Sequence, residues 1–173
     1  MPKSCLKSKQ ASLGEEETTV NAWSDCGGMV TEMFSLRRMA SKVRELTGLK
    51  FKAKLFCACE QKPELRSFIA TNHAPKHMAK DMLDRDWLNR TFTCVWCEDP
   101  VPIPTQGIDI YVCGFPCGPW TSSGLRKGFE DLASKCFWVA VKTAKILQPA
   151  IYVPENATLT TRADGGKDFY KMQ

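Results

Sequence analysis

A cysteine in a stiff loop is the residue of this sequence best placed for covalent chemistry. Residues 108–112 form a short apolar run rich in β-branched residues, which is typical of a buried strand. Glycine and proline alternate over residues 114–119, so the strand must end in a tight loop around Cys117. A thiol just past a buried strand lies where an α/β protein places a nucleophile. The alternative is a small buried residue in a turn, because free cysteines are often buried and inert.

A carboxylate is expected at the same edge of the sheet. Apolar residues recur every three or four positions over residues 129–147, which predicts an amphipathic helix that ends before Pro149. Residues 150–153 predict a further short strand, and Glu155 follows it. The two strands of a strand–helix–strand unit run parallel. If they are neighbours, Cys117 and Glu155 emerge at one carboxyl edge, where open α/β sheets bind ligands.

The first third of the chain has the arrangement of a cofactor-binding fold. Residues 20–24 predict a strand, Gly27 and Gly28 a turn, and residues 30–46 a helix with Gly48 as its C-cap. A glycine turn before a helix N-terminus suits an anionic or polar cofactor. A simple connecting turn is the alternative.

An acidic residue follows the second predicted strand. Residues 55–59 form this strand, Glu60 stands at its end, and Pro63 suits the first turn of a helix that runs to about residue 71. A carboxylate in this position commonly accepts hydrogen bonds from ribose hydroxyls. The alternative is an exposed glutamate that the helix dipole favours.

Cysteine pairs raise the question of a zinc site. Cys57 and Cys59 are separated by one residue and Cys94 and Cys97 by two, and close cysteine pairs recur in structural zinc sites. Neither histidine has ligand spacing to a pair along the sequence, so we expect no metal centre.

Length and composition indicate one soluble globular domain. The chain has 173 residues, is 43% hydrophobic and 25% charged, and carries a net charge of +5, which is compatible with a nucleic-acid partner. We expect no membrane segment and no secretory signal, and therefore a nuclear or cytoplasmic protein whose nine cysteines are reduced. Residues 1–18 are predicted to be a flexible leader, residues 19–161 the domain and residues 162–173 a tail.

Four motifs in order resemble those of cytosine-5 DNA methyltransferases over residues 20–160. Phe115-Pro116-Cys117, with the Trp120, Thr121 and Gly124 that follow, resembles the catalytic motif, and Pro154-Glu155-Asn156-Ala157 resembles the motif of the acid partner. Trp23-Ser-Asp-Cys-Gly-Gly28 resembles the first cofactor motif, with Glu60 as the ribose-binding acid and Lys80-Asp81-Met82 as the adenine-contacting segment.

The resemblance implies a doubly wound, Rossmann-like methyltransferase fold that binds S-adenosylmethionine. It implies that Cys117 adds to carbon 6 of cytosine, that Glu155 holds the Watson–Crick edge of the base, and that Asn156 orders the Glu155 loop. The implied cofactor-binding residues are Trp23, Gly27, Glu60, Asp81 and Pro116.

The chain also departs from the family pattern. Asp25 stands where the first motif has glycine, and Gly118 and Ala157 replace the usual glutamine and valine. No match to the arginine motif, the target-recognition region or the final motif is found, so the fold is expected to be incomplete at its C-terminus.

The resemblance therefore predicts an enzyme that methylates carbon 5 of cytosine in DNA. The missing regions would come from a C-terminal half or a partner chain. One alternative is an inactive fragment that only binds cofactor, nucleic acid or another protein. A second is a tRNA cytosine-5 methyltransferase. Target sequence, maintenance or de novo preference and oligomeric state are not predictable from these residues.

Overall fold

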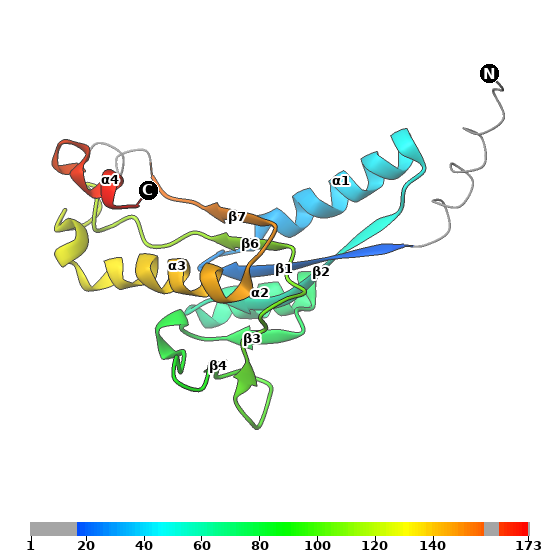
Figure 1. Ribbon diagram of the computed structural model, residues 1–173, viewed down its shortest axis with the longest axis horizontal. Helices are drawn as coiled ribbons and strands as arrows, with labels where there is room; N and C mark the ends of the chain where they lie inside the picture. Colours follow the sequence, from blue (N-terminus) through cyan, green and yellow to red (C-terminus); the bar gives the residue numbers. More distant parts are fainter. Residues whose placement is uncertain (1–16, 158–162, 173) are drawn as a thin grey trace, which may run out of the picture.

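A parallel five-stranded sheet organises the computed structural model, which describes residues 17–157 and 163–172 (Figure 1). Its strand order is β3-β2-β1-β6-β7, and every neighbouring pair is parallel. The strands are β1 (Thr18–Asp25), β2 (Phe51–Cys59), β3 (His77–Ala79), β6 (Ile110–Cys113) and β7 (Ile151–Pro154). Residues 1–16 of the predicted leader lie outside the described residues.

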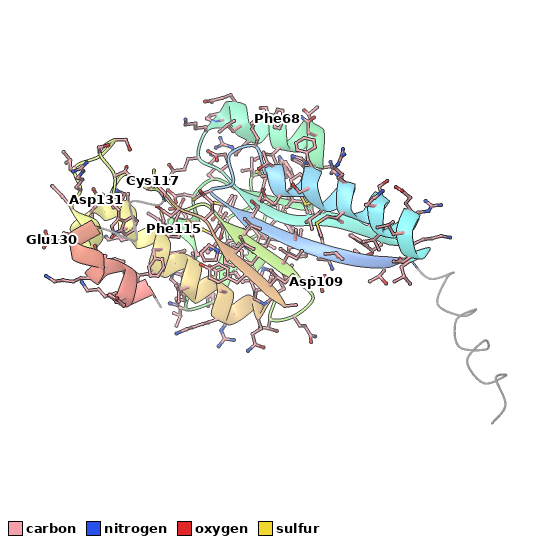
Figure 2. All side chains as sticks on the ribbon, turned by 90° about the horizontal axis from the view of Figure 1, so that it is seen from above. Phe68, Asp109, Phe115, Cys117, Glu130 and Asp131 are labelled. Carbon is pink, nitrogen blue, oxygen red and sulfur yellow. The ribbon has the colours of Figure 1, made fainter. Side chains whose placement is uncertain are left out.

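Helices cover both faces of the sheet, as predicted for a doubly wound fold. They are α1 (Thr31–Thr47), α2 (Pro63–His73) and α3 (Lys135–Leu147). Figure 2 shows α1 and α2, in blue to green, on one side and α3, in yellow to orange, on the other. Because side chains alternate along a strand, the sheet supplies two separate cores. Ala22, Ala58 and Met78 pack with Met33 of α1 and Ile69 of α2. Trp23, Cys57, Tyr111 and Cys113 pack with Phe137 and Ala140 of α3.

The order in which the strands are added to the sheet reverses beside β1. The chain runs from β1 outward to β2 and β3, then returns to place β6 on the other side of β1. In open α/β sheets, the carboxyl ends of the strands at such a switch point hold the ligand site. Here those ends lead into Gly27 and Cys117, respectively.

The predicted helix over residues 129–147 begins later than its apolar pattern suggests. The structure has two 3₁₀ turns, η2 (Gly128–Glu130) and η3 (Leu132–Ser134), before α3. Asp131 accepts from the backbone N–H of Ala133, and the Ser134 hydroxyl donates to the carbonyls of Phe129 and Asp131. These side chains satisfy backbone groups locally and compete with an α-helical start.

Short elements connect the main units. They are η1 (Met82–Asp84), the antiparallel pair β4 (Thr91–Phe92) and β5 (Val101–Pro102), η5 (Ala163–Gly166) and α4 (Lys167–Met172). None of the helices within the described ranges has the length and apolar character needed to span a bilayer.

A buried ion pair ties the end of β1 to α3. Arg85 Nη2 donates to Asp25 Oδ1 at 2.5 Å, and Arg85 Nη1 donates to Thr143 Oγ1. Tyr111 and Trp23 donate to the same carboxylate at 2.7 and 3.0 Å. Burial is the largest single effect on Arg85 and lowers its pKa, but Asp25, Tyr111 and Cys59 together outweigh burial and hold the pKa of Arg85 above its ordinary value. Asp25 therefore points into the core, and its side chain does not enter the turn at Gly27 and Gly28.

Candidate active site and cofactor cavity

Cys117 lies in a tightly closed loop beyond the carboxyl end of β6. Figure 2 shows Asp109, which precedes β6, and Cys117, which follows it, toward opposite ends of the sheet. The Cys117 carbonyl accepts from Trp120 N at 2.9 Å. Gly124 then packs against Gly118 so closely that a Cβ on Gly124 would lie 2.2 Å from the Gly118 oxygen. Two backbone segments therefore meet where only glycine fits.

An aromatic cluster and a buried carboxylate contact this loop and support it. Trp120 packs edge-on against Phe115, and its Nε1 donates to Asp168 Oδ2 at 3.0 Å. Asp168 belongs to α4 and is 7% exposed. The same oxygen would lie 2.2 Å from a Cβ on Gly128, whose φ is +55°. The segment predicted as a tail thus contributes Asp168, which the sequence analysis missed because no local pattern links it to Trp120.

Glu155 lies beside Gly114, where the Cys117 loop begins, because β7 pairs with β6. The register aligns Cys113 with Pro154, and the backbone N–H of Glu155 donates to the Cys113 carbonyl at 2.8 Å. A Cβ on Gly114 would lie 3.3 Å from Glu155 Oε2, so glycine leaves space for this carboxylate. The side chain is exposed and can meet a substrate.

Asn156 connects the two loops directly. Its Nδ2 donates to the Phe115 carbonyl at 2.8 Å, and its Oδ1 accepts from the Ala157 backbone. The amide therefore fixes the Glu155 loop against the Cys117 loop, as the sequence analysis predicted.

Three of the five predicted cofactor residues line one cavity of about 180 Å³. Glu60, Asp81 and Pro116 meet there at the carboxyl ends of β2, β3 and β6. A neighbouring cavity of about 420 Å³ shares Lys80 and Asp81 with it. A polar ligand with an apolar portion fits this arrangement, because carboxylates alternate with sulfur-bearing side chains in the walls.

The two carboxylates of the cavity are held by their own loops. Glu60 Oε1 accepts from the Lys62 backbone at 2.9 Å. Asp81 accepts from Leu83 N at 2.9 Å and from Gln61 Nε2 at 2.8 Å. A carboxylate offers about four acceptor positions, so both retain capacity for hydroxyl or amine donors.

The structure does not bring Trp23 and Gly27 into that cavity. The Trp23 indole is 0% exposed and stacks on Phe56 at 5.9 Å, so its side chain serves the core and would not touch a cofactor. Gly27 lies in the turn after β1, where a Cβ would lie 2.3 Å from Ser24 Oγ. The Ser24 hydroxyl bonds to Glu32 in the first turn of α1, which fixes this turn.

Three thiols, those of Cys26, Cys59 and Cys136, line the cavity and were not predicted as part of it. Hydrogen bonding with Cys113 and burial raise the pKa of Cys26, and a hydrogen bond with Cys26 together with burial raises the pKa of Cys136. Both side chains therefore stay protonated and act as walls. They do not compete with Cys117 for the role of nucleophile.

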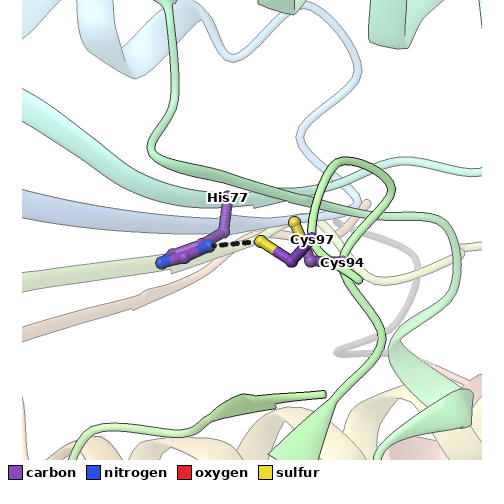
Figure 3. Close-up of side chains that lie close together, drawn as sticks. All are labelled: His77, Cys94 and Cys97. Atoms are coloured by element: carbon purple, nitrogen blue, oxygen red, sulfur yellow. Dashed lines mark hydrogen bonds between the residues drawn. The ribbon is translucent and has the colours of Figure 1, made fainter. Parts of the chain in front are cut away.

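The fold also assembles a histidine and two cysteines that are distant in sequence. His77 begins β3, and Cys94 and Cys97 lie in the loop after β4. Their ligand atoms all lie within 4.8 Å of one another, and Cys97 Sγ is 3.5 Å from His77 Nδ1 (Figure 3). The prediction of no metal centre relied on spacing along the chain, which does not report this proximity.

Comparison with known proteins matches the chain to one family. The family model for C-5 cytosine-specific DNA methylases covers residues 45–172, which is most of the chain and includes Glu60, Asp81, Cys117 and Glu155. The match starts after Trp23 and Gly27 and extends past residue 161, the predicted end of the domain.

Individual relatives come from bacteria and a phage. The type II methyltransferase M.NgoBI of Neisseria gonorrhoeae is 37% identical over 91 residues, which are 53% of this chain and 28% of that protein. The orphan methyltransferase M.SPRI of Bacillus phage SPR is 38% identical over 64 residues, or 37% of this chain and 15% of that protein. The type II methyltransferase M.PspPI of a Psychrobacter strain is 32% identical over 60 residues, or 35% and 14%.

The chain thus spans little more than a quarter of the length of M.NgoBI and about a seventh of the length of the other two. The family match and the parallel sheet agree with the motifs in the sequence. This chain belongs to the C-5 cytosine-specific DNA methylase family.

Proposed function

We propose that this chain supplies the cofactor cavity and the nucleophile of a DNA cytosine-5 methyltransferase. The observation that supports it most strongly is the pairing of β6 with β7. This pairing places the Glu155 carboxylate against Gly114, three residues before Cys117. Both side chains then face one substrate at the switch point of the sheet.

In this proposal Cys117 performs the covalent step. Its thiolate forms a bond from Sγ to carbon 6 of cytosine, and the displaced π electrons make carbon 5 nucleophilic. S-adenosylmethionine, when bound, supplies the methyl group that carbon 5 accepts. A base then removes the carbon 5 proton, the 5,6 double bond re-forms, and Cys117 leaves as the thiolate.

Glu155 stabilises the charge that accumulates on the ring. A carboxyl group at N3 and the exocyclic amine either donates a proton or accepts a hydrogen bond as charge develops there. Asn156 fixes the loop that carries it through the bond to the Phe115 carbonyl. The loop therefore needs little rearrangement when the base arrives.

Glu60 and Asp81 are the residues proposed to hold the cofactor. Their free acceptor positions suit the ribose hydroxyls and the adenine amine, and Pro116 lines the wall of the same cavity next to Cys117. The cofactor and the nucleophile would thus share one loop. Trp23 and Gly27 would act only through the shape of the β1 turn.

Covalent trapping tests the nucleophile. The purified chain is incubated with S-adenosylmethionine and duplex DNA containing 5-fluorocytosine, whose carbon 5 has no removable proton, so the cysteine adduct persists. We expect an adduct that survives denaturation in wild type and in Cys5→Ser, and none in Cys117→Ser. Because the duplex base must be flipped out at a cost of a few kcal/mol, a second arm adds the downstream segment of M.NgoBI as a separate chain.

Two measurements separate the alternatives. A thermal melt with S-adenosylmethionine should show stabilisation in wild type and in Glu64→Ala, and a loss of it in Glu60→Ala and Asp81→Ala. Cofactor-dependent stabilisation without an adduct in either trapping arm would favour a binding fragment. Adducts on 5-fluorocytosine RNA in preference to DNA would favour the RNA-directed alternative.

A further inference from the structure

The His77, Cys94 and Cys97 cluster has the dimensions of a zinc site. Zn–S bonds of about 2.3 Å and Zn–N bonds of about 2.0–2.1 Å at tetrahedral angles separate a sulfur from a nitrogen by about 3.6 Å and two sulfurs by about 3.8 Å. The observed separation of Cys97 Sγ from His77 Nδ1 is 3.5 Å, and no pair in the cluster exceeds 4.8 Å. A side-chain adjustment of about 1 Å or less completes the geometry.

We propose that His77, Cys94 and Cys97 bind one Zn²⁺ ion. Two thiolates and one imidazole form a soft to borderline donor set, which favours zinc over magnesium, calcium or manganese. Cys94 is buried, while His77 and Cys97 are half-buried, so the fourth coordination position faces solvent and takes water. The site uses none of the residues proposed as nucleophile or as cofactor ligands, although Cys94 lines the 420 Å³ cavity together with Asp81.

The imidazole is held in place before any metal arrives. The His77 ring packs on Phe56 with centroids 5.2 Å apart and meets Phe92 edge-on at 5.9 Å. These contacts come from β2, which pairs with β3, and from β4 of the separate two-stranded sheet, and together they restrict the rotation of the ring. In Figure 3 the ring nitrogen nearest to the loop points at Cys97.

The cysteine loop is also tied to the strand that carries the histidine. Val95 N donates to the Met78 carbonyl at 2.7 Å, one residue after His77. This bond fixes the loop that carries Cys94 against β3, and such support orients a ligand residue toward a metal.

A bound ion would have a structural effect on the neighbouring cavity. Cys94 and Val95 line the 420 Å³ cavity that shares Asp81 with the proposed cofactor site. Zinc would therefore fix the wall of this cavity to β3. Metal content is measured without cofactor or DNA, so the zinc proposal and the proposed function can fail independently.

Metal analysis of the full chain tests the proposal. The chain is purified after expression with zinc, and its zinc content is measured by inductively coupled plasma mass spectrometry. We expect about one ion per chain in wild type and in Cys136→Ala, which removes a buried thiol outside the cluster. Cys94→Ser/Cys97→Ser and His77→Ala should retain less than about a tenth of it. Equal zinc content in wild type and the double variant would overturn the proposal.

Two measurements on wild type guard against variants that fail to fold. Replacement of zinc by Co²⁺ should produce the intense near-ultraviolet absorption of thiolate–cobalt charge transfer. Alkylation with iodoacetamide, mapped by mass spectrometry, should spare Cys94 and Cys97 until a chelator removes the metal. Cobalt spectra without this absorption, alkylation that a chelator does not change, or a Cys94–Cys97 disulfide in the protein as purified would each refute the site.

Discussion

At the scale of single residues, two glycines of the Cys117 loop differ in what a side chain would meet. A Cβ on Gly124 would lie 2.2 Å from the Gly118 oxygen and 2.7 Å from its carbonyl carbon. Both are backbone atoms, which cannot rotate away. A Cβ on Gly118 would meet nothing within 4 Å. A methyl group added at Gly124 would therefore clash with the backbone, whereas one added at Gly118, six residues earlier, would not.

We expect Gly124→Ala to destabilise the chain by about 1–3 kcal/mol, because the clash must be relieved by backbone shifts. Gly118→Ala, its matched control, should change the free energy of unfolding by less than about 0.5 kcal/mol. Urea denaturation measures both. Similar values for the two variants would show that the Gly118–Gly124 contact is not close in solution.

At the scale of elements, α4 acts as a support for the Cys117 loop. Its Asp168 accepts from Trp120 Nε1 and also bonds to Lys171, whose side chain is 60% exposed. A hydrogen bond from a buried indole to a carboxylate is worth about 1.5–3 kcal/mol, whereas an exposed ion pair contributes about 0–1 kcal/mol. The contact with Trp120 should therefore dominate.

Asp168→Ala is expected to loosen the loop between Trp120 and Gly128. Arg126 and Lys127 are exposed in this loop and are trypsin sites. Limited proteolysis should cleave there several-fold faster in Asp168→Ala than in wild type, because local opening becomes easier. Lys171→Ala should cleave at the wild-type rate. Equal acceleration in both variants would assign the effect to loss of the ion pair.

At the scale of the whole molecule, the sheet of the described residues ends at β7 with one side unpaired. Ile151 and Val153 of this strand are 53% and 42% exposed. Unpaired backbone groups beside exposed apolar side chains favour pairing with another strand. The structure therefore presents β7 as a surface for association.

We expect the chain to self-associate with increasing concentration and Val153→Lys to reduce this association, because a lysine on an edge strand opposes pairing. Leu46→Lys is the control, since Leu46 is 70% exposed in the last turn of α1, and the C-terminal end of α1 lies apart from β7 in Figure 1. Sedimentation velocity measures all three. If both substitutions reduced self-association equally, the added charge would act through general solubility and not by blocking pairing at the β7 edge.

Local patterns account for the parts of this fold that sequence reasoning predicted. The Gly48 C-cap of α1, Pro63 at the start of α2 and the glycine–proline loop after β6 depend on residues within a few positions of one another. The motifs around Cys117 and Glu155 are equally local, so the sequence alone predicted the family and both candidate catalytic residues. Parallel strands joined by a helix then made a shared sheet edge the expected outcome.

Tertiary structure decided the contacts between distant segments. The sequence argument had to assume that β6 and β7 are neighbours, and the tertiary structure shows that they pair. Asp168 meets Trp120 across 48 positions, and His77 meets Cys97 across 20, through loops whose closure no periodicity reports. Burial keeps the Trp23 side chain out of the cavity that Glu60 and Asp81 line. Propensity and turn chemistry act between neighbours along the chain, whereas burial and side-chain partnership depend on the summed packing of all elements.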